Sequence, residues 1–291
     1  MKIYIIPLDK RLQPEKIGVK YPNHNDDYGV EQDFFKFLNV NKHLITTNPM
    51  EADFHYLPIF WTNWHISHNY AKTGIDDLEL AVRKAILDDK KTFTICQYDD
   101  GPIIELGQTI LFLASRKTKT GIDIPLLCKK HRKPFFKTNK KYLASFLGKV
   151  RTSEIRRKMV DILKDKKEFF IYEGNNGSRF FVKKILESYV TLSPRGYGGS
   201  SFRLFESMQL GVAPFLVGDL DTRPFKKYID WKSCSFYTND PKNIIDILAN
   251  TKKEDLIMMG EKSLEIYDTM LSYQKWCNFV IKELEDYGNN P

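Results

Sequence analysis

The stretch from Tyr189 to Trp231 constrains the fold more than any other part of this 291-residue chain. A short β-branched run predicts a buried strand, a glycine-rich turn follows at 194–199, and a helical pattern extends from Phe202 to Leu210. Gly211 predicts the helix end, because glycine most easily takes the left-handed conformation required there. A second apolar strand at 212–217 completes a βαβ unit, which is typical of a parallel α/β sheet.

The turn and the start of this helix have the features of an anion-binding site. A helix N-terminus exposes backbone N–H groups and a partial positive charge. Glycines let the backbone approach a phosphate closely, while serine hydroxyls and arginines can donate hydrogen bonds to it. The candidate residues are Arg195, Gly198, Gly199, Ser200, Ser201 and Arg203. Glu206, one helical turn after Arg203, could accept hydrogen bonds from a ribose. A capped helix with an ordinary Arg–Glu surface pair fits the same spacing equally well.

Two separated blocks of this sequence resemble the exostosin family of glycosyltransferases. The string SPRG…SSFRLFESMQLGVAPFLVGD…RPFKKYIDW resembles the C-terminal signature of that family, and YGVEQDFFKFL followed by TTNPMEADFHYLP resembles its N-terminal pattern. The resemblance implies an α/β fold with two Rossmann-like domains facing a cleft, which is the GT-B type. It also implies an inverting transfer of a sugar from a nucleotide-sugar donor.

The resemblance also implies a division of the chain into two domains. Residues 1–140 would form the acceptor-side domain and residues 141–271 the nucleotide-sugar-binding domain. Apolar residues recur at helical spacing from Leu256 to Tyr287, and a final helix at about 272–291 would pack back on the first domain. Arg151 and Arg156 follow the first strand of the second domain, where family members carry basic residues near the donor diphosphate.

An inverting transfer needs a base for the acceptor hydroxyl and stabilisation of the departing nucleoside diphosphate. The resemblance places the base in the N-terminal domain, where Asp99 and Glu31 are the leading candidates and Asp100 is the next. The loop acids Asp26 and Asp27 are alternatives. Asp99 and Asp100 also fit an ordinary turn at the end of the predicted strand 93–96. Many family members have histidine where this chain has Tyr98, so no histidine is assigned a role there.

No metal ion and no cofactor are expected. Asp219-Leu220-Asp221 has the DxD pattern that binds a metal in another class of sugar transferases, but we interpret it as a pair of loop acids near the sugar. Arginines and the helix dipole would neutralise the leaving diphosphate instead. His65, predicted in a loop after the second strand, shows no zinc-ligand spacing, and a structural role is favoured over contact with the acceptor.

The composition suits a packed, reduced, cytoplasmic protein with an anionic partner. The formal net charge is +8, and the lysine-rich segment 126–141 interleaves cations with aromatic rings. Such a segment can bind nucleic acid, but a solvated basic face is the interpretation favoured for most of these lysines. No run of apolar residues approaches the roughly 20 that a membrane span needs. The four cysteines are widely spaced and predict free thiols.

The donor and acceptor follow from the resemblance alone. UDP is the usual carrier in the family, and the compact form is similar to exostosin-like transferases of large algal viruses. This implies a UDP-xylose donor, a fucose-containing glycan acceptor and the host cytoplasm as the compartment. The alternative is a non-catalytic basic module that binds a polyanionic glycan or nucleic acid, in which the glycine-rich turn is only structural.

Overall fold

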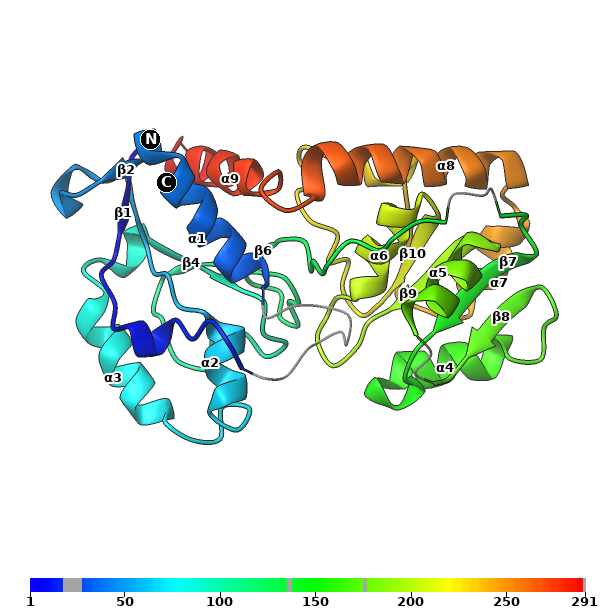
Figure 1. The fold of residues 1–291 in the computed structure, drawn as a ribbon, viewed down its shortest axis with the longest axis horizontal. Coiled ribbons are helices and arrows are strands. Elements are labelled where there is room, and N and C mark those ends of the chain that lie inside the picture. The colour runs from blue at the N-terminus through cyan, green and yellow to red at the C-terminus, as the bar shows by residue number, and fades with distance from the viewer. Residues whose placement is uncertain (18–27, 135–137, 175–176, 290–291) are drawn as a thin grey trace. The chain divides into compact units, whose positions relative to one another are not determined.

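A computed structural model of the chain describes residues 1–17, 28–134, 138–174 and 177–289 (Figure 1). These residues divide into two compact units. Unit 1 comprises Met1–Leu127 and Tyr273–Pro291, and unit 2 comprises Cys128–Ser272. The first boundary was predicted at residue 140 and lies at Leu127 in the structure. His131, in the segment that follows, donates its backbone N–H to Gln209 on a helix of unit 2.

Unit 1 is built on a six-stranded parallel sheet with the order β2-β1-β3-β4-β5-β6. Its strands are β1 (Ile3–Ile5), β2 (Ile45–Thr46), β3 (Phe54–Tyr56), β4 (Thr92–Cys96), β5 (Ile110–Leu113) and β6 (Ile122–Asp123). Its helices are α1 (Val30–Val40), α2 (Trp61–Ser67), α3 (Ile75–Ala85) and α9 (Cys277–Asn289). Short 3₁₀ turns lie at Lys10–Leu12, Lys42–Leu44, Pro49–Glu51 and Asp89–Lys91.

The C-terminal segment is part of the core of unit 1. The Phe34 ring of α1 lies 5.8 Å from the Phe93 ring of β4 and 5.9 Å from the Trp276 ring just before α9, measured between ring centroids. The buried Asp33 carboxylate accepts hydrogen bonds from the Gln274 backbone N–H at 2.8 Å and from Trp276 Nε1 at 2.8 Å. Aromatic packing and these charge-assisted hydrogen bonds therefore fasten the last helix to the first.

Unit 2 is built on a five-stranded parallel sheet with the order β11-β10-β9-β7-β8. Its strands are β7 (Tyr142–Leu147), β8 (Phe169–Tyr172), β9 (Ser188–Pro194), β10 (Ala213–Val217) and β11 (Phe236–Thr238). Its helices are α4 (Glu154–Leu163), α5 (Ser178–Leu186), α6 (Phe202–Leu210), α7 (Asn243–Ala249) and α8 (Lys253–Ile266), which a π-helical turn at Tyr267–Leu271 continues. Short 3₁₀ turns lie at Val150–Thr152 and Trp231–Ser233.

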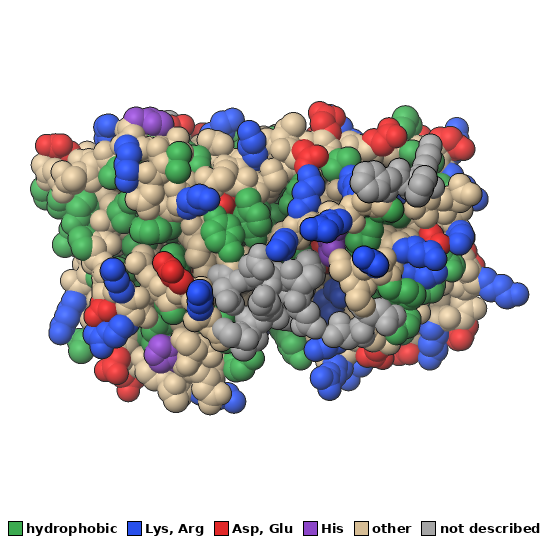
Figure 2. Space-filling view, viewed as in Figure 1, with side chains coloured by type: hydrophobic (Ala, Val, Ile, Leu, Met, Phe, Trp, Pro, Cys, Tyr) green, Lys and Arg blue, Asp and Glu red, His purple; other side chains and the backbone are tan. Residues whose placement is uncertain are grey.

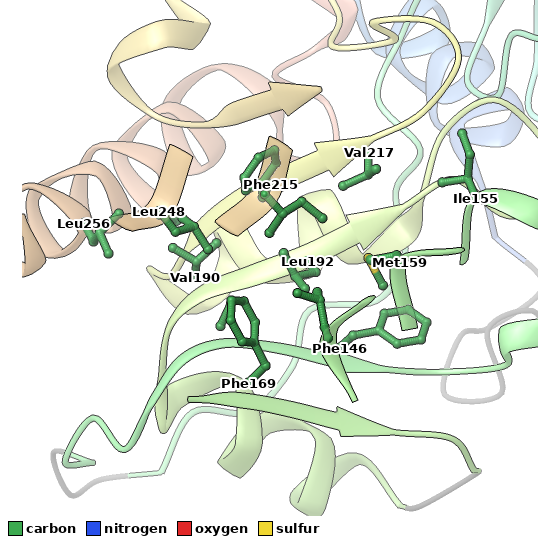
Figure 3. Packing of buried hydrophobic residues seen from close by; sticks show 14 residues of the cluster. Phe146, Ile155, Met159, Phe169, Val190, Leu192, Phe215, Val217, Leu248 and Leu256 are labelled. Atoms are coloured by element: carbon green, nitrogen blue, oxygen red, sulfur yellow. The ribbon is translucent and has the colours of Figure 1, made fainter. Parts of the chain in front are cut away.

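The core of unit 2 lies between its sheet and the helices that cover it. Figure 3 shows Leu192 and Phe215 of neighbouring strands packed in one cluster with Met159 of α4 and Leu248 of α7. All four side chains are 0–1% exposed. The sheet residues are apolar on consecutive positions because a parallel sheet covered by helices is buried on both faces.

The predicted βαβ unit around the glycine-rich turn is confirmed. β9 and β10 pair in parallel, with Val190 opposite Ala213. Helix α6 spans the predicted residues and ends at Gly211, whose φ of 73° is left-handed. The predicted fold class of two Rossmann-like α/β units, which GT-B glycosyltransferases share, is confirmed by the two parallel sheets. The segment containing His65, by contrast, was expected to be a loop and is helix α2.

Candidate functional site

Two buried serine hydroxyls lie at the N-terminus of α6. Ser200 and Ser201 are each 3% exposed, and neither Oγ has a hydrogen-bond partner in the described part of the chain. Ser201 is the N-cap residue of α6, yet its side chain does not cap the helix. A buried hydroxyl without a partner costs about 1–3 kcal/mol. This arrangement is suited to a ligand that accepts hydrogen bonds, and the helix N-terminus favours an anion.

Hydrogen bonds fix the shape of the loop that precedes these serines. The Gly196 N–H donates to the Ser200 carbonyl at 3.2 Å, and Thr222 Oγ1 donates to the Gly199 carbonyl at 3.2 Å. Gly198 and Gly199 are buried, whereas Tyr197 between the glycines is 55% exposed. The predicted glycine loop is thus a turn whose shape is supported by a hydrogen bond within the loop and by one from Thr222.

Arg156 supports this loop and does not face solvent as a free cation. Its guanidinium is buried and donates to three backbone carbonyls: Nε to Arg195 at 2.9 Å, Nη2 to Pro194 at 3.1 Å and Nη1 to Lys149 at 3.1 Å. A Cβ atom added to Gly196 would lie 3.2 Å from Nη2, so glycine leaves room for the guanidinium. Arg156 was predicted to lie near the donor diphosphate; the structure assigns its hydrogen bonds to the loop backbone. Arg151, also predicted there, is exposed in the turn before α4.

Arg203 lies in the first turn of α6, against the end of β7. Its Nε donates to the Leu147 carbonyl, and its guanidinium lies over the Phe146 ring at 5.2 Å from the centroid. A Cβ atom added to Gly148 would lie only 1.9 Å from Arg203 Nη2. The absence of a side chain at Gly148 therefore allows Arg203 its position. Arg203 was predicted as a site residue and Gly148 was not, because the two residues meet only in the folded chain.

Both acids of the DxD pattern pair with arginines. Asp219 Oδ2 lies 2.5 Å from Arg195 Nε, and Asp221 Oδ2 lies 2.7 Å from Arg223 Nη2. Burial acts to raise the pKa of Asp221, but hydrogen bonds and charge from Arg223 hold that pKa below its ordinary value. Across the residues that the structure describes, no three His, Cys, Asp or Glu side chains form a group that could hold a metal ion.

Glu206 was predicted to contact a ribose, which suggested an accessible side chain, but the side chain is buried. Its side chain is 6% exposed, and Oε1 accepts a hydrogen bond from His131 Nε2 at 2.9 Å. His131 was not singled out from the sequence, where it stands among the lysines of the basic segment. Two of these lysines are paired, Lys130 with Asp268 at 2.7 Å and Lys141 with Glu187 at 2.8 Å. Figure 2 shows lysine and arginine side chains spread over the visible face with acidic side chains among them.

In unit 1, Glu31 is a buried residue of α1, and its carboxylate lies against the first turn of α2. Its carboxylate accepts hydrogen bonds from the Thr62 N–H at 3.1 Å, from Thr62 Oγ1 at 2.9 Å and from the Gln97 N–H at 2.8 Å. Burial raises the pKa of Glu31 to about 7, although these hydrogen bonds act to lower it. A pKa near 7 suits a general base, but Glu31 is only 1% exposed.

The other candidate bases follow β4. Asp99 is half-buried and accepts a hydrogen bond from Ser115 Oγ at 2.9 Å. Asp100 is exposed and pairs with Lys117. Gln97, whose N–H donates to Glu31, directly follows β4, and Asp99 is two residues further on, so both acids lie near the C-terminal end of β4. Asp26 and Asp27 lie outside the described residues.

His65 has a structural environment. It is fully buried in α2, and its ring centroid lies 4.5 Å from that of Tyr98. Burial lowers the pKa of His65 to about 4, so the ring is neutral at physiological pH. The four cysteines are buried free thiols, as predicted. None of the helices among the described residues is long and apolar enough to cross a membrane.

Comparisons with known proteins bear on this arrangement. Residues 114–251 match the exostosin GT47 domain. The chain is 24% identical to a protein described as an exostosin-1 homolog from Caenorhabditis elegans, over 98% of this chain and 88% of that protein. Among solved structures, it is similar to AviGT4, a glycosyltransferase involved in avilamycin A biosynthesis, with 10% identity, full coverage of this chain, 98% of the other and a TM-score of 0.44. TarM is similar over 72% of this chain and 57% of its own, with 10% identity and a TM-score of 0.38.

The sequence matches define the class of the protein. The two parallel-sheet units, the loop at α6 and the matched domain support a glycosyltransferase. Within that class, the domain match and the nematode relative support the exostosin family, as the resemblance in the two sequence blocks had implied.

Proposed function

We propose that the protein is an inverting glycosyltransferase that moves a sugar from a UDP-sugar to a glycan hydroxyl without a metal ion. The observation that carries this proposal is a pair of buried hydroxyls at the start of α6, those of Ser200 and Ser201, which have no hydrogen-bond partner among the described residues, with Arg203 in the first turn of the helix. This is a site for an anion that accepts several hydrogen bonds at once, and the diphosphate of a nucleotide sugar is such an anion.

The anion site would stabilise the leaving group. As the bond between the anomeric carbon and the diphosphate oxygen breaks, negative charge grows on UDP. The helix N-terminus, the two hydroxyls and the guanidinium of Arg203 would offset this charge in fixed positions. Arg195 would contribute as well, its pairing with Asp219 keeping it at the loop. These cations would make a metal ion unnecessary.

Asp99 would be the base that takes the proton from the acceptor hydroxyl. Among the three predicted carboxylates it combines partial exposure with a hydrogen bond from Ser115 that can fix its orientation. Glu31, enclosed by Thr62 and Gln97, would hold α2 in place beside it. In a single displacement the acceptor oxygen would form its bond on the face opposite to UDP, which inverts the anomeric centre.

Xylose as the sugar and a fucose-containing glycan as the acceptor rest on the family resemblance. The test is incubation with UDP-xylose, UDP-glucose, UDP-N-acetylglucosamine and UDP-glucuronic acid, each with fucosylated oligosaccharides and EDTA. We expect UDP release that requires the acceptor and persists in EDTA, and a β-linked product by NMR from an α-linked donor. Retention of configuration, or activity abolished by EDTA and restored by Mn²⁺, would contradict the proposed mechanism. Transfer of another sugar would refute only the choice of xylose.

A further inference from the structure

We propose that His131 is a positioning residue: it orients the Glu206 carboxylate toward the ribose of the donor nucleotide, and Ser178 orients His131 in turn. This inference rests on the proposed function, since it has meaning only if a nucleotide binds at α6. It adds a specificity element made of two residues: His131, in the basic segment after the unit boundary, and Glu206, on the helix whose N-cap residue is Ser201 and which contains Arg203.

The hydrogen bonds of His131 form a directed chain. Nε2 lies 2.9 Å from Glu206 Oε1, and Nδ1 lies 3.1 Å from Ser178 Oγ. Because a carboxylate oxygen can only accept, the proton on this side of the ring must be on Nε2. In the neutral ring Nδ1 then accepts from the Ser178 hydroxyl. Glu206 thus selects the tautomer, and the Ser178 hydroxyl, by donating to Nδ1, fixes the other side of the ring.

Two helices hold the His131 ring in place. Its centroid lies 5.2 Å from that of Phe181 on α5, and its backbone N–H donates to Gln209 Oε1 on α6 at 3.2 Å. Gln209 Nε2 also donates to Tyr267 Oη at 3.0 Å. The His131 side chain is 1% exposed, so that solvent does not compete for its hydrogen bond to Glu206. A ring fixed on both sides can fix the plane of the carboxylate that it binds.

The orientation of the Glu206 carboxylate matters for nucleotide binding because of where Glu206 lies on α6. It follows Arg203 by three residues and so shares a side of α6 with the residue proposed to bind the diphosphate. A carboxylate has roughly four sites for accepting hydrogen bonds. His131 and the buried Cys128 thiol both hydrogen-bond this carboxylate, which restricts its rotation, and a ribose hydroxyl would use a remaining acceptor site. Without His131, the carboxylate would lose the donor whose ring is held between α5 and α6.

The test measures discrimination between nucleotides that differ only in the ribose. Affinities for UDP, 2′-deoxy-UDP and 3′-deoxy-UDP are determined by calorimetry for the wild type, His131→Asn, His131→Gln and Ser178→Ala. The asparagine side chain places an amide near the position of Nδ1 but has no donor at the position of Nε2. The longer glutamine side chain places an amide N–H near the position of Nε2. His43→Asn, at an exposed histidine of unit 1, is the matched control.

We expect the wild type to lose about ten- to a hundred-fold in affinity for at least one deoxy nucleotide, as a hydrogen bond to a charged group implies. His131→Asn should remove most of this ratio, His131→Gln should recover part of it, and the control should leave it unchanged. Ser178 is exposed, so Ser178→Ala should fold and lower the ratio by a few-fold even if His131→Asn does not fold.

Two results would overturn the inference while leaving the proposed function intact. One is UDP binding by the wild type without discrimination against either deoxy nucleotide. The other is an undiminished ratio in both His131→Asn and Ser178→Ala, even with lowered melting temperatures, because that pattern indicates a purely structural hydrogen bond. Failure of the wild type to bind UDP at all would instead refute the proposed function.

Discussion

Glu31→Gln should change how the stability of unit 1 depends on pH. The folded pKa of Glu31 is raised by burial from an ordinary 4.5 to about 7. Between these values the folded chain holds a proton that the unfolded chain releases. The stabilisation linked to this proton is therefore fully present below pH 4.5 and is lost as the pH rises through 7. At 1.36 kcal/mol per pKa unit, the loss is about 3 kcal/mol.

Glutamine should preserve the geometry while removing the titration. Its amide oxygen can occupy the place of Oε1, which accepts from Thr62 Oγ1 and from the Gln97 N–H. The amide is neutral at every pH of interest. We therefore expect the variant and the wild type to have similar free energies of unfolding near pH 4.5, and the variant to become about 3 kcal/mol more stable by pH 8.

Urea unfolding followed by circular dichroism between pH 4.5 and 8 provides the measurement. Glu105→Gln, at an exposed position, is the control and should leave the pH dependence of the wild type unchanged. A free-energy difference between Glu31→Gln and the wild type that is the same at pH 5 and pH 8 would refute the raised pKa. A variant that is less stable at pH 8 would show that the ionised carboxylate is needed by its three donors.

Two further predictions concern single side chains. Gly148→Ala should displace the Arg203 guanidinium, because the new Cβ would lie 1.9 Å from Nη2, and should raise the Kd for UDP about ten-fold or more; the φ of 158° at this position should also lower the melting temperature. Gly177→Ala, where an added Cβ meets no atom of the described residues within 4 Å, should leave the Kd unchanged, and an unchanged Kd in Gly148→Ala would contradict the role of Arg203. Asp33→Ala leaves the Gln274 N–H and Trp276 Nε1 without their acceptor and should cost about 3–5 kcal/mol in urea unfolding, against little for the exposed Asp165→Ala. A cost below about 1 kcal/mol would mean that the C-terminal segment is held by its apolar contacts alone.

Local signals made the βαβ unit predictable from the sequence. The glycine-rich turn, the helical spacing from Phe202 to Leu210 and the stop at Gly211 each depend on residues close together in the chain. His65 was expected in a loop after the second strand, but it lies in the helix at 61–67, whose N-cap residue Phe60 has no side-chain capping hydrogen bond. The first turn of this helix receives the Glu31 carboxylate from α1 instead, and that partner is thirty-one positions away from Thr62.

The candidate site was predictable in its location and less so in its contacts. Spacing placed Ser200, Ser201 and Arg203 at the helix N-terminus, and the structure brings them together there. The same reasoning could not anticipate that Arg156 donates to the loop carbonyls or that Glu206 is bonded to His131. Both contacts join segments far apart in the chain, and in each case the charged residue is buried. Sequence patterns identify a charged residue but not the partner that burial requires.

The central claim is that the loop and the start of α6 bind the diphosphate of a uridine nucleotide. Calorimetric titration of UDP, GDP and ADP into the wild type and Arg203→Ala, in the presence of EDTA, tests it most directly. The account predicts UDP-selective binding by the wild type that survives EDTA, with affinity lowered about ten-fold or more in Arg203→Ala. Binding of none of these nucleotides, together with salt-sensitive binding of long polyanions, would contradict it and favour the basic binding module.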